Sequence, residues 1–318
     1  MSLLARLTLI SDTEPDPEDF LESSLGVIFP DDVANQHGDH NNSLLYTSPH
    51  LPKPLPLSLA DPKGTEDRKL FSHYLWNSSL QLAELVEAGT LGLGSLDDDD
   101  DDDDEKKERR RRIASPCCDF NVGGLSTIEL GAGTALPSIM SALLGAKRVA
   151  VTDYPAPEIL ETLRRNVSTL AQPQFSPMGR VVALEGEEGG VEVHGHGWGE
   201  FPGPWEQENQ HAFDRVFAAD CLWMPWQHEN LRTSIDWFMG TGPEARAWVV
   251  AGFHTGRDNM RGFFETDGLR RHGLVVDRIW ERDCNGADRE WAWEREKEDI
   301  SERKRWLVIA CLRRDLVN

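Results

Sequence analysis

Two glycines, Gly131 and Gly133, separate an apolar segment over residues 126–130 from a segment over 136–144 with apolar residues at helical spacing. The pattern predicts a strand, a tight turn and a helix. Glycine lets the backbone approach a ligand closely, and the first N–H groups of the helix favour negative or polar groups. A second strand is predicted over 148–152, and Asp153 follows it, where a carboxylate can accept hydrogen bonds from ribose hydroxyls. We therefore expect a nucleoside-containing cofactor at this turn.

The spacing of the turn residues argues against a dinucleotide. The G-x-G-x-x-G pattern needs a third glycine where this chain has Leu136. Glu129 stands two residues before Gly131, and the resulting E-x-G-x-G resembles the turn of class I S-adenosylmethionine (SAM) methyltransferases. A tight turn in an unrelated α/β protein is the alternative, and an NAD-dependent oxidoreductase is a further one.

The remaining hydrophobic pattern alternates strands with helices. It predicts an α/β fold with a doubly wound, mostly parallel seven-stranded sheet, Rossmann-like, and one antiparallel strand near its edge. Of His194 and His196, at alternate positions, one is expected to face the interior, and no metal site is indicated. The further strands are predicted at 181–184 or 191–194, 213–219, 246–253, 274–281 and 306–313, and helices at 156–170 and 259–271.

Charged and aromatic residues follow several of these strands. Trp198 comes after the third strand, and Asp220 and Trp223 come after the fourth. Ligands of such sheets bind outside the carboxyl ends of the strands. We therefore expect these side chains to converge with Asp153 and the glycine turn.

Five segments together resemble the seven-β-strand methyltransferases, specifically the fungal type of the protein lysine and N-terminal methyltransferase group often named nicotinamide N-methyltransferase-like. The likeness extends from about Phe71 to the C-terminus. Its segments are LWN (75–77), ELGAGTALP (129–137), VTDYP (151–155), GWG (197–199) and AADCLW (218–223).

The resemblance implies roles for single residues. Trp76, otherwise a plain core aromatic, would pack near the methionine part of SAM, Asp153 would hold the ribose and Trp198 would stack beside the adenine. Catalytic roles fall on Asp220, which would face the nucleophile, and on Trp223, which stands where the family's D-x-x-Y motif has tyrosine. The implied cofactor-binding residues are Trp76, Glu129, Gly131, Gly133, Asp153, Tyr154, Trp198 and Ala219.

The chain before the catalytic region differs in composition. Residues 1–68 are rich in Pro, Ser, Asp and Asn and are expected to form an extension, partly disordered or with an added hairpin of 25–29 and 44–46. The methyltransferase domain is expected over 69–318, beginning with a helix that ends near Gly89. A charged insertion at about 95–115 contains the aspartate run 97–104 and is expected to be solvated and disordered.

Charge and cysteine content limit the partners and the compartment. A net charge of -22 with pI about 4.8 argues against nucleic acid and favours basic protein partners. Five cysteines without a C-x-x-C pair indicate neither a disulfide framework nor a zinc site. No signal peptide or membrane span is predicted. We expect a reduced, soluble, cytoplasmic monomer, with the nucleus as an alternative suggested by KKERRRR.

These features predict a SAM-dependent N-methyltransferase acting on a lysine or N-terminal amine of a protein, for which a basic translation factor is one candidate. A lysine must lose its proton first, which costs roughly 4 kcal/mol near pH 7.4, whereas an N-terminal amine needs less help. Two alternatives are a small-molecule, nicotinamide-like methyltransferase and a non-catalytic interaction protein with this fold.

Overall fold

The computed structural model describes residues 2–11, 35–38, 42–60, 74–93, 120–185, 190–295, 299 and 303–315. The predicted strand at 25–29, the aspartate run and the first residues of the predicted N-terminal helix lie outside the described residues.

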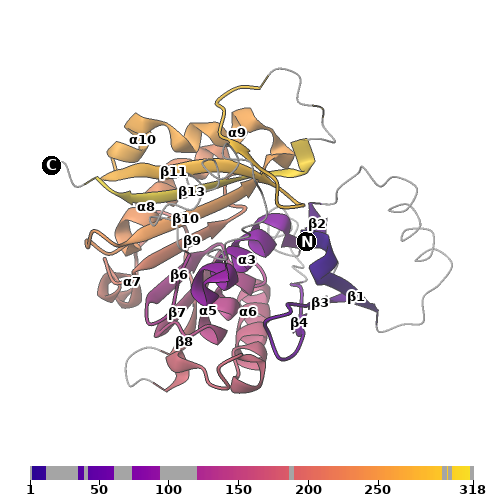
Figure 1. The fold of residues 1–318 in the computed structure, drawn as a ribbon. Coiled ribbons are helices and arrows are strands. Elements are labelled where there is room, and N and C mark those ends of the chain that lie inside the picture. Colours follow the sequence, from indigo (N-terminus) through magenta and orange to yellow (C-terminus); the bar gives the residue numbers. More distant parts are fainter. Residues whose placement is uncertain are drawn as a thin grey trace.

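A large twisted sheet forms the centre of the molecule (Figure 1). Five adjacent strands in the order β10-β9-β6-β7-β8 are parallel, β13 runs antiparallel to both of its neighbours, and the short β12 lies at the edge beside β11. The mostly parallel sheet is confirmed, with β12 as an additional edge strand. The strands are β6 (Ser126–Leu130), β7 (Arg148–Asp153), β8 (Val191–Gly195), β9 (Arg215–Ala219), β10 (Arg246–Gly252), β11 (Leu274–Asp283), β12 (Asp288–Glu290) and β13 (Trp306–Arg314).

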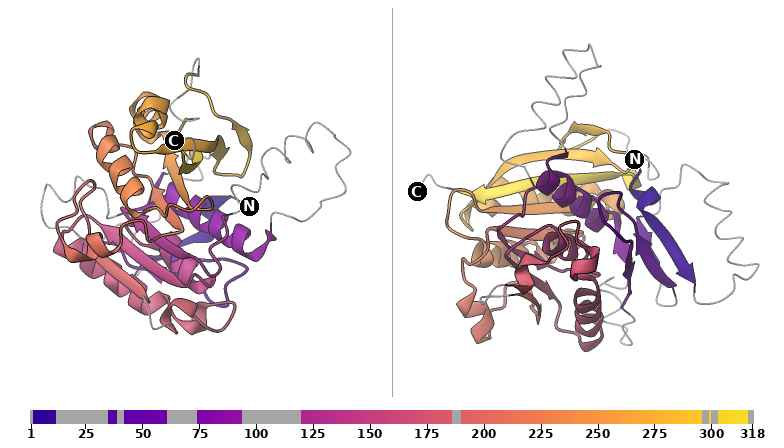
Figure 2. Two further views of the ribbon diagram at one scale, coloured as in Figure 1. Left: turned by 90° about the vertical axis from the view of Figure 1, so that its left-hand side faces the viewer. Right: turned by 60° about the horizontal axis from the view of Figure 1, so that its bottom comes forward.

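Helices cover both faces of this sheet (Figures 1 and 2). One face packs against α3, α5 and α6, and the other against α7, α8, α9 and α10. Strand residues alternate between the two cores: Trp248 and Val250 belong to the first, and Val249 to the second. The helices are α3 (Asn77–Leu91), α5 (Leu136–Leu143), α6 (Pro157–Leu170), α7 (Pro204–Glu208), α8 (His228–Phe238), α9 (Arg257–Arg261) and α10 (Thr266–Arg270).

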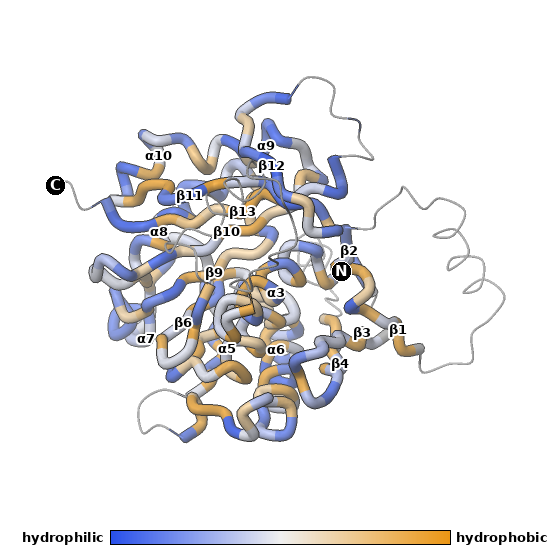
Figure 3. Tube along the Cα trace, in the orientation of Figure 1, coloured by the Kyte–Doolittle hydropathy of each residue, from blue (hydrophilic) through white to orange (hydrophobic). Residues whose placement is uncertain are grey.

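Hydrophobic residues are concentrated along the central strands (Figure 3). This distribution follows from burial on both faces, which removes the polar alternation that a one-sided sheet would show. No helix in the described part of the chain combines the length and hydrophobicity needed to cross a membrane.

The segment 259–271 differs from the single helix that its sequence predicts. It forms the end of α9, a 3₁₀ turn η8 (Gly262–Phe264) and α10. Gly262 lacks the side chain that would favour a continued helix. At Gly268, a Cβ atom would lie 2.9 Å from the guanidinium carbon of Arg232, so packing against α8 requires the small residue.

A three-stranded antiparallel sheet from the N-terminal extension packs beside α3 and α6 (Figure 1). Its strands are β1 (Leu7–Ser11), β3 (Asn42–Tyr46) and β4 (Leu55–Leu57), preceded by η1 (Leu3–Arg6). An ion pair of 2.8 Å joins Arg6 Nε to Glu84 Oε1 on α3. The predicted strand at 44–46 thus forms, with partners that its sequence did not indicate.

A second contact joins the N-terminal extension to the backbone directly before α3. Strand β2 (Gln36–His37) pairs with β5 (Leu75–Trp76), directly before α3. The side chain of His37 hydrogen-bonds Asn77 Oδ1 at 2.6 Å through Nε2. The extension therefore supports the backbone that carries Trp76.

The cysteines differ partly from the reduced state expected from the sequence. Cys221 and Cys284 are buried free thiols. Cys311 on β13 is disulfide-bonded.

Candidate active site

One pocket opens at the carboxyl ends of β6, β7, β8 and β9, where the sequence places its charged and aromatic strand-end residues. The arrangement follows from the parallel strands, whose carboxyl ends meet at one edge of the sheet. The predicted site residues that line this pocket are Trp76, Gly131, Gly133, Asp153, Tyr154, Trp198, Ala219, Asp220 and Trp223.

The glycine turn forms one wall of the pocket. Gly131 has φ +70° and Gly133 has φ +56°, backbone conformations that side chains rarely adopt. A Cβ atom at Gly131 would lie 3.0 Å from Cys221 Sγ and 3.1 Å from the Trp198 ring. The glycine is therefore needed both for the turn and for the close packing of the indole of Trp198.

Ala135 shows the same backbone constraint just before α5. Its φ is +63°, and its side chain is buried. Glycine adopts this conformation more readily than a residue with a side chain, so the backbone at Ala135 is strained.

Asp153 is held by backbone N–H groups on both carboxylate oxygens. Gly133 N donates to Oδ2 at 2.8 Å, and Tyr154 N donates to Oδ1 at 2.7 Å. Burial raises the pKa of Asp153 to about 6, although both hydrogen bonds oppose that shift. The carboxylate is thus oriented before any ligand arrives, and it is ionised at neutral pH.

Glu129 does not line the pocket. Its buried carboxyl lies beneath the turn, where Ser138 N and Ser138 Oγ both donate to Oε2, at 3.0 and 2.5 Å. Burial raises the pKa of Glu129 to about 8 against these hydrogen bonds. Glu129 therefore fixes the start of α5, and through it the glycine turn.

Trp198 is positioned by a buried polar contact behind its loop. Ser234 Oγ on α8 accepts a hydrogen bond from Gly199 N at 2.9 Å and also contacts His196 Nε2 at 2.9 Å. His196 is buried as expected for one of the two histidines, whereas His194 Nε2 pairs with Glu192 Oε2 at 2.9 Å. Both histidines thus have structural partners.

Asp220 leaves strand β9 with an unusual backbone. Its φ is +59°, a left-handed conformation that aspartate tolerates better than most residues. Asp220 N donates to Val250 O at 2.8 Å, and Gly252 N lies 3.3 Å from Oδ1. The left-handed turn directs the chain out of the sheet, so the carboxylate reaches the pocket.

The loop after Asp220 carries Trp223, and a hydrogen bond from a residue of α8 fixes this loop. His228 Nε2 hydrogen-bonds Leu222 O at 2.9 Å, and burial lowers the pKa of His228. The neutral imidazole donates this bond, which keeps Trp223 at the pocket wall.

Several residues near the pocket were not identified from the sequence. Tyr74, Gln227 and Asn230 line it, and His254 lies directly behind it in η7 (Phe253–Thr255). His254 Nε2 donates to Asp220 Oδ1 at 3.0 Å. The strand-end rule that selected Asp153 and Asp220 applies to His254 as well, because it follows β10.

The chain is similar to several fungal enzymes that share one name. "Protein N-terminal and lysine N-methyltransferase EFM7" of Gibberella zeae is 27% identical over 275 residues, which cover 81% of this chain and 86% of that protein. The protein of the same description from Schizosaccharomyces pombe is 26% identical over 69% of this chain and 74% of its own length. That from Eremothecium gossypii is 32% identical over 50% of this chain and 57% of its own length.

The chain is a SAM-dependent methyltransferase. Both the α/β fold and the relatives expected from the sequence are confirmed. No protein-family model matches the chain.

Among solved structures, the methyltransferase is similar to a putative RNA methyltransferase of Pyrococcus horikoshii, with TM-score 0.42, 15% identity and coverage of 76% of this chain and 84% of that one. A ribosomal protein L11 methylase of Lactobacillus delbrueckii subsp. bulgaricus gives TM-score 0.37 and 12% identity over 74% and 79% of the two chains.

Proposed function

We propose that this methyltransferase transfers the methyl group of SAM to an amine of a protein, either a lysine side chain or an N-terminus. The observation that carries the proposal is the carboxylate of Asp220 at the wall of a pocket that the aromatic residues Trp76 and Trp223 also line. The names of the fungal relatives, which specify N-terminal and lysine methylation, support it.

The pocket residues fit SAM. At Gly131 a side chain would collide with its neighbours, so the bare backbone leaves room for a ligand, and at Gly133 a Cβ would meet open space. Asp153 keeps lone pairs available for two ribose hydroxyls beyond its two backbone bonds. Trp198 offers an aromatic surface for the adenine, and Ala219 and Tyr154 complete that wall.

SAM, when bound, supplies a methyl group on a positively charged sulfur. The protein's contribution is then to align the amine and to exclude water. Glu129 acts through Ser138 by holding the turn, and Trp76 lines the pocket next to Asp220.

The amine must arrive without a proton, because its lone pair attacks the methyl group. Removal from water and the nearby positive charge on the sulfur of SAM disfavour the charged ammonium form, and the carboxylate of Asp220 accepts a hydrogen bond from the remaining N–H. Trp223 also lines the pocket, with an indole where the family's D-x-x-Y motif has a phenol, so orientation of the amine depends on Asp220.

Incubation of the protein with labelled SAM and a cell extract tests the proposal. We expect label in protein bands, and mass spectrometry should locate it on lysine or an N-terminal nitrogen. Label that enters only small molecules would contradict a protein substrate and support the nicotinamide-like alternative. Absence of any SAM binding by calorimetry would support a non-catalytic interaction protein.

The pH dependence of SAM affinity tests the role of Asp153. Its pKa is raised to about 6, so the carboxylate is ionised above that pH and protonated below it. A protonated carboxyl loses an acceptor, and we expect SAM affinity to fall as pH drops through 6. Calorimetry from pH 5 to 8 measures this.

Asp153→Asn should weaken SAM binding about 10- to 100-fold at pH 7.5, from the roughly 1.5–3 kcal/mol of a hydrogen bond to a charged group. Its affinity should no longer vary through pH 6. Asp258→Asn changes an exposed aspartate on α9 and serves as the control. A pH-dependent Asp153→Asn variant would show that another group titrates.

The proposal includes the partner and the organisation of the chain. The net charge of -22 favours a basic substrate such as a translation factor. The catalytic unit runs over residues 69–318, and the protein acts as a cytoplasmic monomer without nucleic acid. Light scattering and fractionation of cells expressing a tagged chain test the last two statements.

A further inference from the structure

His254 lies behind the pocket wall, in contact with the proposed catalytic carboxylate. Its Nε2 donates to Asp220 Oδ1 at 3.0 Å, and the side chains are only 16% and 6% exposed. A hydrogen bond at this depth is shielded from water, so it restrains the carboxylate more than a surface pair would.

Both donors to Asp220 reach the same oxygen. Gly252 N lies 3.3 Å from Oδ1, beside the bond from His254. Among the described residues, no hydrogen bond reaches Oδ2. Because Asp220 lines the pocket, this second oxygen remains for an incoming N–H group.

The imidazole of His254 is also fixed on its face. Trp76 stacks on it with 4.8 Å between ring centroids and 23° between the planes. Tyr74 in turn meets the edge of Trp76 at 6.2 Å. Two pocket-lining aromatic residues therefore hold the ring in the plane that points Nε2 at Asp220.

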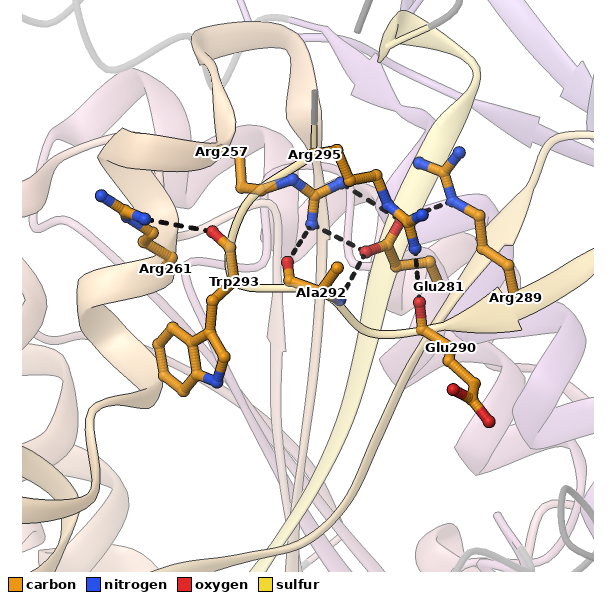
Figure 4. A network of polar contacts seen from close by, with 8 residues as sticks. All are labelled: Arg257, Arg261, Glu281, Arg289, Glu290, Ala292, Trp293 and Arg295. Carbon is orange, nitrogen blue, oxygen red and sulfur yellow. Dashed lines mark hydrogen bonds and ion pairs between the residues drawn. The ribbon is translucent and has the colours of Figure 1, made fainter. Parts of the chain in front are cut away.

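The backbone that carries His254 is anchored by a buried network (Figure 4). Arg257, three residues later on α9, donates to Glu281 Oε1 at 2.7 Å and to Oε2 at 3.2 Å. Arg289 donates to the same carboxylate at 2.6 Å. The turn η7 is thus held between β10 and this network.

Two charges act on His254 from neighbouring elements, Asp220 from the end of β9 and Arg303 before β13. Burial lowers the pKa of His254, but the charge and hydrogen bond of Asp220 outweigh burial and Arg303, so the net shift is upward. The same charge and hydrogen bond of Asp220 that raise this pKa hold the imidazole against the carboxylate.

We propose that His254 is a positioning residue for methyl transfer, which holds Asp220 Oδ1 so that Oδ2 accepts a hydrogen bond from the substrate amine. The proposal rests on the proposed function, because it assigns Asp220 to the target amine. His254 touches neither the amine nor SAM and acts through Asp220.

Three variants test this role. His254→Phe keeps the aromatic stack on Trp76 and removes the hydrogen bond, whereas His254→Gln keeps a donor. His272→Phe is the matched control, since His272 Nε2 also lies 3.0 Å from a carboxylate, that of Glu229, away from the pocket.

We expect His254→Phe to lower kcat about 10- to 100-fold, the loss of one hydrogen bond to a charged group, with the Kd for SAM unchanged within about twofold. His254→Gln should recover part of kcat. Its rate should no longer show the change with pH that titration of the imidazole causes. His272→Phe should behave as wild type. A wild-type kcat in His254→Phe, or equal losses in the Phe and Gln variants, would overturn the proposal.

A titration independent of activity separates this inference from the proposed function. NMR should show the pKa of His254 above its ordinary value of 6.5 in the wild type and lower in Asp220→Asn. An unshifted His254 would refute the pair. If the enzyme methylates only small molecules, the protein-substrate proposal fails. The role of His254 is then tested by comparing the same variants with the small-molecule amine that accepts the label.

Discussion

Replacing Asp220 by asparagine is expected to lower kcat by about 10²- to 10⁴-fold, the range associated with a positioned acid–base group. Asparagine keeps the shape of the side chain, and like aspartate it tolerates the left-handed backbone at φ +59°. The amide presents one oxygen and one NH₂ group. If the oxygen stays with His254, the NH₂ group faces the amine and repels its N–H.

The Kd for SAM should change little in Asp220→Asn, because Asp153 and the glycine turn carry the proposed cofactor contacts. Calorimetry for SAM and initial rates for methyl transfer separate the two effects. Asp258→Asn, an exposed aspartate, controls for the charge change. A variant that lost both SAM affinity and kcat would indicate that Asp220 contacts the cofactor and not the amine.

Replacing Glu281 by alanine is expected to destabilise the protein by about 3–5 kcal/mol, because it breaks a buried ion pair and leaves buried cations without their anion. Glu281 is fully buried on β11, and it pairs with Arg257, Arg289 and Arg295 (Figure 4). Arg257 also lies 4.1 Å from the centroid of the Phe253 ring, so its position affects the turn that carries His254.

Urea unfolding measures the loss, and Glu290→Ala, at an exposed residue of the neighbouring strand β12, is the control. Burial raises the pKa of Glu281, but its hydrogen bond and ion pair with Arg257, together with Arg289, outweigh burial and lower it. The stabilisation is therefore present above the unfolded value of 4.5 and is lost as pH falls through the folded value. The difference between Glu281→Ala and wild type should shrink in acid. A constant difference down to pH 2 would contradict the ionic origin.

The local pattern of the chain was sufficient to predict the strand, turn and helix around Gly131 and Gly133. Periodicity determined which segments are strands, since burial on both faces leaves near-continuous apolar runs. The position of Asp153 and Asp220 just at strand ends then predicted one shared pocket, because parallel strands end at the same edge.

Two parts of the fold did not follow from the local hydrophobic pattern. These are helix α8 and the segment 259–271, which is not one continuous helix. His228–Phe238 has polar residues on much of its surface, and its buried side is defined only by packing on β9 and β10. At Gly268, the decisive contact is with Arg232 on another helix. The N-terminal strand β1 likewise depends on partners 31 or more residues away, such as Leu7 opposite Tyr46.

The sequence by itself determined the fold class and the glycine turn, because these depend on spacing within single strand–helix units, and the strand ends placed Asp153 and Asp220 in one pocket. Only the tertiary structure decided that Glu129 bonds Ser138 rather than facing the pocket, and that His254 reaches Asp220. The physical reason is that both contacts depend on which way side chains point, across the turn between β6 and α5 for Glu129 and between the ends of β9 and β10 for His254. Their hydrogen bonds join residues 9 and 34 positions apart, and spacing alone does not specify such pairs.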